Sequence, residues 1–206
     1  MSTTESPAGQ IDLFGQPAVH TETHRLFFAL MPDADTRQDI NHAAAQVQKQ
    51  HPELRARWVK PERFHATLNF LGDYPVVPDE VVKKATAAAS HLRAESFAWT
   101  LDYVASFRGR EPPCVLRSSH VPEPLLALWR DLHARLAQAG VRLRAERQFT
   151  PHVTLAYGRH ELPEAMAMTP ILWHVDRFVL IHNVVGKGHY QILGSWPLSG
   201  DGPQVR

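Results

Sequence analysis

The alternation of apolar and polar residues along the chain predicts a series of short β-strands. Successive strand residues point to opposite faces, so apolar residues at every second position indicate a sheet with one buried face. The first strand is expected at Arg25 to Leu30, where the run RLFFAL stops before Pro32. Further strands are expected at 57–60, 64–71, 97–107, 114–119, 141–146, 150–157, 176–185 and 189–198, the last two as a hairpin around Gly186 and Gly188.

Three other segments have the apolar spacing of amphipathic helices. The first helix is expected to be capped by Asp33 or Asp35 and to run to about residue 50, and two more are expected at 78–92 and 124–140. Helix and strand follow one another in two successive sets. Because the connections are short, antiparallel sheets are favoured. The expected fold class is therefore α+β, built from a duplicated unit.

Two of the expected strands carry the same polar pair within an apolar run. HATLNFLG, residues 65–72, contains His65 and Thr67, and PHVTLAYG, residues 151–158, contains His152 and Thr154. In each strand the histidine and the threonine share one face, because they are two residues apart. A single pair of this kind would be unremarkable among 13 histidines. Two matched copies indicate a common function.

Strict alternation also assigns a face to the neighbours of each pair. Asn69 is expected beside His65 and Thr67, and Phe70 on the opposite face, which packs into the core. By the same period, Tyr157 is expected on the core face of the second strand.

A histidine and a threonine on one strand face suit phosphodiester chemistry. An imidazole transfers protons near neutral pH, and a threonine hydroxyl donates a hydrogen bond to an anionic oxygen. If the fold brings the two pairs together, one histidine can act as general base and the other as general acid. The residues alone leave open which histidine is the acid. They also leave two alternatives, a metal-dependent phosphoesterase and a non-catalytic RNA-binding module, although neither motif contains a carboxylate.

The two motifs resemble the paired H-x-T-x motifs of the 2H phosphoesterase superfamily. FFAL in the first strand, RWVK before the first motif, F-x-P before the second and the final G-x-Y-x-I-L-x-x-W-P-L resemble its RNA 2′,3′-cyclic phosphodiesterase branch, long called 2′-5′ RNA ligase. The resemblance covers residues 25–198. It implies a bilobal α+β fold with two antiparallel sheets, helices outside, and a central cleft carrying one motif from each lobe.

The resemblance also implies a reaction. The substrate would be an RNA or nucleoside 2′,3′-cyclic phosphate, opened to a 2′-phosphate without a cofactor. His65 would be the proton donor and His152 the proton acceptor, and Thr67 and Thr154 would hold the phosphoryl oxygens. Reverse ligation, forming a 2′-5′ bond, would use the same groups.

Substrate contacts are expected around the motifs. Basic residues precede both of them, so Arg63 and Arg147 are expected to bind RNA phosphates, and Phe149 is expected to stack on an unpaired base. A solvated strand edge for the arginines and a core position for Phe149 are the alternatives. Tyr157 stands where the second family motif commonly has arginine, and Arg159 could supply that charge instead.

The composition of the chain limits which partners, metal sites and cellular compartment are expected. The chain has 206 residues with 22 basic and 21 acidic side chains, so any attraction to nucleic acid must be local. The single cysteine, Cys114, leaves no internal disulfide and no multi-cysteine zinc site, which favours a reducing cytoplasm. The N-terminal residues lack the apolar core of a secretory signal, and no apolar stretch approaches the roughly 20 residues that span a bilayer. A cytoplasmic monomer without a metal ion is expected.

The composition also predicts the boundaries of the domain. Residues 1–24 are expected to be a flexible tail, 25–198 a single bilobal domain, and 199–206 a short C-terminal tail. Within the first tail, QIDLF at Gln10 to Phe14 resembles the Q-L-[SD]-L-F peptide by which many bacterial proteins bind the DNA sliding clamp. The alternative is that this apolar segment packs on the domain.

Overall fold

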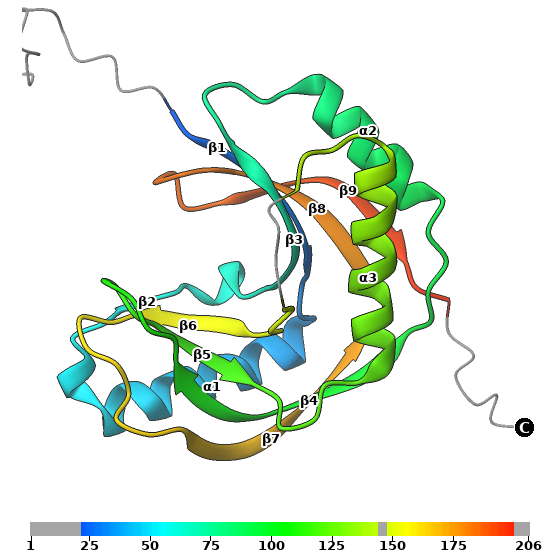
Figure 1. Ribbon diagram of the computed structural model, residues 1–206. Coiled ribbons are helices and arrows are strands. Elements are labelled where there is room, and N and C mark those ends of the chain that lie inside the picture. The colour runs from blue at the N-terminus through cyan, green and yellow to red at the C-terminus, as the bar shows by residue number, and fades with distance from the viewer. Residues whose placement is uncertain (1–21, 144–147, 200–206) are drawn as a thin grey trace, which may run out of the picture.

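The computed structural model describes residues 22–143 and 148–199, which form two antiparallel sheets flanked by helices (Figure 1). The first sheet has the strand order β3-β1-β8-β9, and the second has the order β2-β6-β5-β4-β7. The first consists of β1 His24–Leu30, β3 Ala66–Tyr74, β8 Arg177–Val184 and β9 Tyr190–Pro197. The second consists of β2 Arg57–Trp58, β4 Phe97–Ser106, β5 Pro113–Arg117, β6 Val153–Tyr157 and β7 Met166–Val175. The expected α+β class with two antiparallel sheets is confirmed.

The helices agree closely with the expected segments. They are α1 Ala34–Gln50, α2 Asp79–Ser90 and α3 Glu123–Gln138, with two short 3₁₀ turns, η1 Pro52–Leu54 and η2 Pro61–Arg63. Asp33 is the N-cap of α1, and its carboxylate accepts a hydrogen bond from the Thr36 amide at 2.8 Å. None of the helices in the described ranges is long and apolar enough to cross a membrane.

The chain contains two successive sets of helices and strands, and each set contributes elements to both sheets. Helix α1 follows β1 of the first sheet but packs against β7 of the second. Helix α3 follows β5 of the second sheet but packs against β3 and α2 beside the first (Figure 1). Strands β8 and β9 then return to the first sheet. Each lobe therefore contains elements from both ends of the chain.

One apolar cluster connects both sheets and all three helices. It includes the buried faces of the helices and the stacked indoles of Trp99 and Trp173, whose ring centroids are 5.4 Å apart. Both indoles are almost completely buried. The lobes are thus held together by shared core packing, in addition to the chain connections between them.

The structure differs from the expected strands in two places. The sequence pattern does not predict strand β7, because Pro170 interrupts its apolar residues. The pairing of β7 with β4 is irregular between residues 167 and 171 of β7. Strand β7 lies at the edge of its sheet, where a proline is tolerated. Val141 to Leu143, the start of the strand expected at 141–146, form no regular element, and residues 144–146 lie outside the described ranges.

Both motif strands contain a bulge at the leucine that follows the threonine. The pairing of β3 with β1 skips Leu68, and the pairing of β6 with β5 skips Leu155. A bulge adds one residue to a strand and shifts the following side chains to the other face. The two motifs therefore share a backbone irregularity as well as a sequence.

The bulges overturn the face assignments made from strict alternation. Asn69 is 3% exposed, and its side-chain Nδ2 lies 3.3 Å from Nδ1 of His133 on α3, away from the motif histidine. Phe70 instead packs with a small apolar cluster that includes Phe27. Tyr157 is 38% exposed, not buried.

Backbone hydrogen bonds continue slightly beyond the expected domain boundaries. At the N-terminal end, the Val185 amide donates to the Thr23 carbonyl at 2.9 Å. At the C-terminal end, the Ser199 amide donates to the Ala94 carbonyl, also at 2.9 Å. The QIDLF segment lies outside the described residues.

Candidate active site

A cavity of about 610 Å³ lies between the two sheets. It is lined from the first sheet and η2 by residues that include Arg25, Arg63, His65 and Tyr190, and from the second sheet by residues that include Arg57, Trp58, Thr154 and Tyr157. One residue of each H-x-T motif therefore borders the same space. Its size is that of a typical small-molecule site, roughly 300–1,000 Å³.

His65 is held in one orientation at the first sheet. It directly precedes β3, and its Nδ1 donates a hydrogen bond to the Arg63 carbonyl at 2.8 Å. The ring packs against Phe27 and edge-on against Tyr190, with centroids 5.1 and 5.3 Å away. Burial is the main reason that the pKa of His65 is lowered to about 4; the hydrogen bond to the Arg63 carbonyl opposes this shift, and smaller contributions from His152 and the Arg63 guanidinium add to it. His65 is therefore neutral at pH 7 in the empty cavity.

His152 is held in the same way at the second sheet. It directly precedes β6, and its Nδ1 donates to the Thr150 carbonyl at 2.7 Å. Its ring is perpendicular to that of Phe107, with centroids 4.9 Å apart. Burial lowers the pKa of His152 below its usual value, and the positive charge of Arg117 adds to the effect.

The two backbone contacts decide which nitrogen can react. A neutral imidazole that donates from Nδ1 carries its proton there and leaves a lone pair on Nε2. His65 and His152 both have this arrangement, so each presents Nε2 as a proton acceptor, or as a donor once protonated. The imidazoles are also close enough for a charge on His152 to lower the pKa of His65. Of the two histidines that the sequence singled out, His65 lines the cavity, and His152 is not among the described residues that line it.

The threonines are placed less symmetrically. Thr154 lines the cavity directly. Thr67 is partly buried on β3, where it pairs with Ala29, and is not among the described residues that line the cavity.

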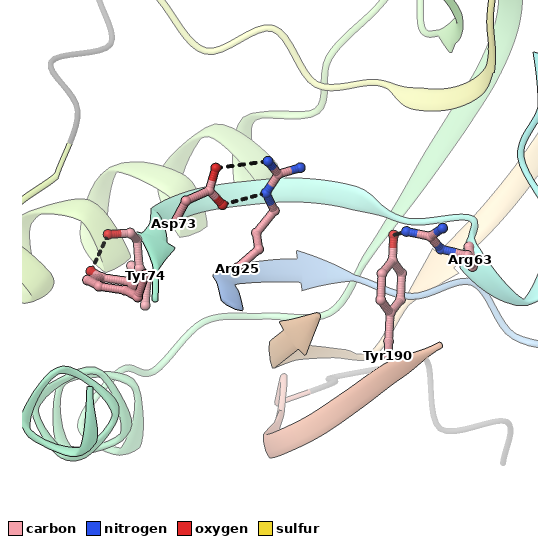
Figure 2. Close-up of polar contacts among 6 residues, drawn as sticks. Arg25, Arg63, Asp73, Tyr74 and Tyr190 are labelled. Atoms are coloured by element: carbon pink, nitrogen blue, oxygen red, sulfur yellow. Dashed lines mark hydrogen bonds and ion pairs between the residues drawn. The ribbon is translucent and has the colours of Figure 1, made fainter. Parts of the chain in front are cut away.

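Tyr190 and Arg63 form a polar contact beside His65 (Figure 2). The Arg63 guanidinium lies 4.8 Å from the centroid of the Tyr190 ring, and its Nη2 is 3.4 Å from the phenol oxygen. That oxygen is also 3.4 Å from Nδ1 of His65, and burial raises the pKa of the phenol. Sequence reasoning predicted Arg63 but not Tyr190. The tyrosine of the final G-x-Y-x-I-L run was the signal that could have identified it.

Of the other two residues expected to bind substrate, Phe149 is not among the described residues that line the cavity. Phe149 stacks on Trp129, with ring centroids 5.0 Å apart and planes 4° from parallel, and it packs against the core. Arg147 lies outside the described residues. Tyr157 lines the cavity, and the Arg57 guanidinium lies 5.0 Å from the centroid of its ring. Arg57 is the cross-strand partner of Tyr157, so strand β2 places a positive charge beside this tyrosine.

The single cysteine, Cys114, is not among the described residues that line the cavity. Burial raises the pKa of the Cys114 thiol to about 12, so this sulfur stays protonated. Within residues 22–143 and 148–199, histidine, cysteine and carboxylate side chains do not form any group of three that could hold a metal ion.

Comparisons with known proteins agree with this site. Residues 30–117 match the family described as LigT like phosphoesterase. The RNA 2′,3′-cyclic phosphodiesterase of Escherichia coli (strain K12) is 30% identical over 185 residues, which are 87% of this chain and 99% of that protein. A protein of the same name from Geobacillus stearothermophilus is 28% identical over 183 residues, which are 84% of this chain and 57% of that protein.

The fold comparison gives the same result. The crystal structure of E. coli LigT complexed with 3′-AMP superposes with a TM-score of 0.73 and 28% sequence identity, covering 86% of this chain and 99% of that one. Similarity of sequence and of fold extends over most of both chains, including both histidine motifs. The chain belongs to the LigT-like phosphoesterases of the 2H superfamily.

Proposed function

We propose that this protein hydrolyses the 2′,3′-cyclic phosphate of an RNA end or of a nucleoside and leaves a 2′-phosphate. The observation that carries the proposal is the matched pair of histidines, one from each sheet. Each is fixed through Nδ1 to a backbone carbonyl and has Nε2 left for proton transfer. The names of the bacterial relatives point to the same reaction class.

The chemistry needs two protons to move in opposite directions. Nε2 of His152 takes a proton from water as the water oxygen attacks phosphorus. The bond from phosphorus to the 3′ oxygen breaks, and the proton on Nε2 of His65 goes to that oxygen. The product carries its phosphate on the 2′ oxygen. Thr154 and Thr67 donate hydrogen bonds to the phosphoryl oxygens.

The lowered histidine pKa values fit this scheme if the substrate brings a charge. A cyclic phosphate is an anion, and an anion beside an imidazole raises the pKa of the imidazole. Binding would therefore favour protonation of His65, which is neutral in the empty cavity. Arg63 and Arg57, which line the cavity, would attract the same anion. Substrate binding and proton uptake are expected to be coupled.

The reverse reaction follows from the same groups. The 5′-hydroxyl of a second RNA, deprotonated by one histidine, can attack the phosphorus of a 2′,3′-cyclic phosphate. The bond from phosphorus to the 3′ oxygen breaks, the other histidine protonates that oxygen, and the two RNAs are joined by a 2′-5′ bond. We infer a side activity of 2′-5′ ligation at high concentrations of RNA ends.

The direct experiment uses purified protein with 2′,3′-cyclic AMP and with a short RNA ending in a cyclic phosphate. The 2′-phosphate isomer is the expected product. His65→Ala and His152→Ala should each lower the rate by about 10²–10⁴-fold, the usual effect of losing one acid or base. The double variant should be little slower than the slower single variant, since the two groups act as a unit.

The control is His91→Ala, an exposed histidine at the end of α2. It should keep wild-type turnover. Wild-type rates in either motif variant would refute the two-histidine mechanism. Binding of RNA without any turnover in the wild type would favour the non-catalytic module.

Three further expectations concern the setting of the enzyme. We infer that residues 25–198 act as one catalytic domain and that the protein works as a monomer. A reducing cytoplasm suits the protonated thiol of Cys114. We also infer that Gln10 to Phe14 contact a DNA sliding clamp, since their sequence presents two apolar side chains after a glutamine.

A further inference from the structure

A second cavity, of about 470 Å³, adjoins the catalytic one. The two cavities share Arg57, Glu111 and Tyr157. The remaining lining of the second cavity is Arg55, Ala56, Arg110, Gly158 and Arg159. We call this second cavity the arginine pocket.

The arginine pocket has an unusual balance of charge. Arg55, Arg57, Arg110 and Arg159 line it together with a single carboxylate, Glu111. Within the described part of the chain, none of the four arginines forms an ion pair, whereas Arg25, Arg130 and Arg177 each do. Four uncompensated guanidinium groups around one depression make a strongly positive surface. Such a surface attracts a ligand with several negative charges.

The backbone of the arginine pocket is fixed by hydrogen bonds between three segments. The Arg159 amide donates to the Leu54 carbonyl at 2.9 Å, and the Gly158 amide donates to the Pro112 carbonyl at 2.9 Å. A Cβ at Gly158 would lie 2.6 Å from the His160 carbonyl oxygen, so a larger residue does not fit there. These bonds hold the segments that carry Arg55, Arg110 and Arg159. The backbone positions from which these three arginine side chains extend are therefore fixed relative to one another.

Arg55 has a backbone conformation that arginine does not favour. Its φ of 44° and ψ of 45° lie in the left-handed region, and it is the one non-glycine residue with positive φ among the described residues. Glycine adopts this conformation without steric cost, whereas a residue with a Cβ does not. An arginine at such a position indicates that its side chain has a function.

Tyr157 connects the two cavities. Its ring is 38% exposed and borders both spaces, with the Arg57 guanidinium 5.0 Å from its centroid. An exposed aromatic ring flanked by arginine is a common platform for an unpaired base.

A third cavity shares Arg25 with the catalytic one. There, Arg25 is held by Asp73 through two hydrogen bonds of 2.8 and 2.9 Å (Figure 2). The other charged residue in the described lining of this third cavity is Arg142. Among the described residues, the arginine pocket therefore carries more unpaired positive charge than this third cavity.

We propose that the arginine pocket binds the phosphodiester backbone of single-stranded RNA just 5′ of the cyclic end, with a base stacked on Tyr157. The inference rests on the proposed function, because a 2′,3′-cyclic phosphate is terminal and the rest of an RNA chain extends in the 5′ direction only. It makes RNA ends the preferred substrate class over cyclic mononucleotides. A cyclic mononucleotide has no phosphodiester other than its cyclic phosphate, so it has no backbone phosphate to place in the arginine pocket.

The test compares the two substrates in one triple variant, Arg55→Gly, Arg110→Ala and Arg159→Ala. None of these residues lines the catalytic cavity, and glycine suits the backbone at position 55. We expect kcat/KM for a hexanucleotide with a cyclic end to fall about 10–100-fold at low salt, since several phosphate contacts are lost. The value for 2′,3′-cyclic AMP should stay within about twofold of the wild type.

The control variant removes the same charge elsewhere on the surface. Lys49→Ala, Lys83→Ala and Lys84→Ala change exposed lysines on α1 and α2. This variant should keep the wild-type preference for RNA. An equal loss of RNA activity in both variants would mean that only net charge matters, and an equal loss on both substrates in the arginine variant would mean general damage to the enzyme. Either result overturns the proposal.

A binding measurement separates this inference from the proposed function. The affinity for a hexanucleotide ending in a 3′-hydroxyl is measured by fluorescence anisotropy at several salt concentrations. Three lost arginine–phosphate contacts should reduce the slope of log K against log salt by about 2, at about 0.7 per contact. Identical slopes for the wild type and the arginine variant would refute the arginine pocket as an RNA site. Failure of the wild type to turn over either substrate would refute the proposed function, while the binding result would still decide the role of the arginine pocket.

Discussion

The buried state of His65 predicts how the stability of the protein depends on pH. In the folded protein the pKa of His65 is about 4, and in an unfolded chain the pKa of a histidine is about 6.5. Between these values the unfolded state binds a proton that the folded state excludes. The stabilisation from a neutral His65 is therefore present above pH 6.5 and is lost as the pH falls from 6.5 towards 4.

The magnitude follows from the two pKa values. At pH 5, a group with these pKa values lowers the free energy of unfolding by about 2 kcal/mol relative to pH 7. The full loss below pH 4 would be about 3 kcal/mol, at 1.36 kcal/mol for each unit of pKa shift. The ring packs against Phe27 and Tyr190 but also borders the cavity, and His65 as a whole is half-buried. Water in the cavity screens part of the effect, so these energies are upper limits.

The assay compares the wild type with His65→Gln, which keeps a polar side chain of similar size but does not titrate. Urea unfolding, followed by tryptophan fluorescence, gives the free energy of unfolding of each protein at pH 7 and pH 5. Other histidines contribute nearly equally to both proteins, so the difference between the two pH dependences isolates residue 65. The wild type should lose about 2 kcal/mol more than the variant. The same loss in both would show that His65 is not buried as a neutral group.

Three further outcomes are expected. The kcat/KM for a cyclic phosphate should rise as the pH is lowered from 8 towards 6. One imidazole must be protonated, and the pKa values of His65 and His152 both lie below the usual value for histidine. A kcat/KM that falls over this range would contradict the proposed acid and base roles of the two histidines. Turnover should survive exhaustive EDTA, because histidine and threonine need no Lewis acid, and loss with rescue by zinc or manganese would favour a metal-dependent enzyme. A peptide of residues 6–20 should bind a bacterial sliding clamp in the micromolar range, about −8 kcal/mol, and Leu13→Ala with Phe14→Ala should abolish this binding; an absence of binding at high micromolar clamp would refute the clamp contact.

The strongly periodic parts of the fold could be predicted from the sequence. The helices carry clear apolar spacing and, in α1, an aspartate cap, and the hairpin of β8 and β9 turns through two glycines with positive φ. Strand β7 could not be predicted because an edge strand tolerates a proline that the same pattern would exclude from a sheet interior. The exchange of α1 and α3 between the lobes leaves no local signal, because it depends on contacts between distant segments.

The candidate site was predictable to a similar degree. The four residues of the two H-x-T motifs are visible as a repeat, and one residue from each motif, His65 and Thr154, lines the cavity. The bulge in each strand was not visible, and it reverses the faces of Asn69 and Tyr157. A bulge depends on pairing with the neighbouring strand, so the alternation of apolar and polar residues within one strand does not reveal an inserted residue.

The exchange of helices between the lobes has a consequence for how this protein can be divided. A fragment ending before β4 would keep α1 without the strand on which it packs, and the complementary fragment would keep α3 without β3. Neither half would contain a closed core, so neither is expected to fold alone, even though the chain contains two copies of one motif.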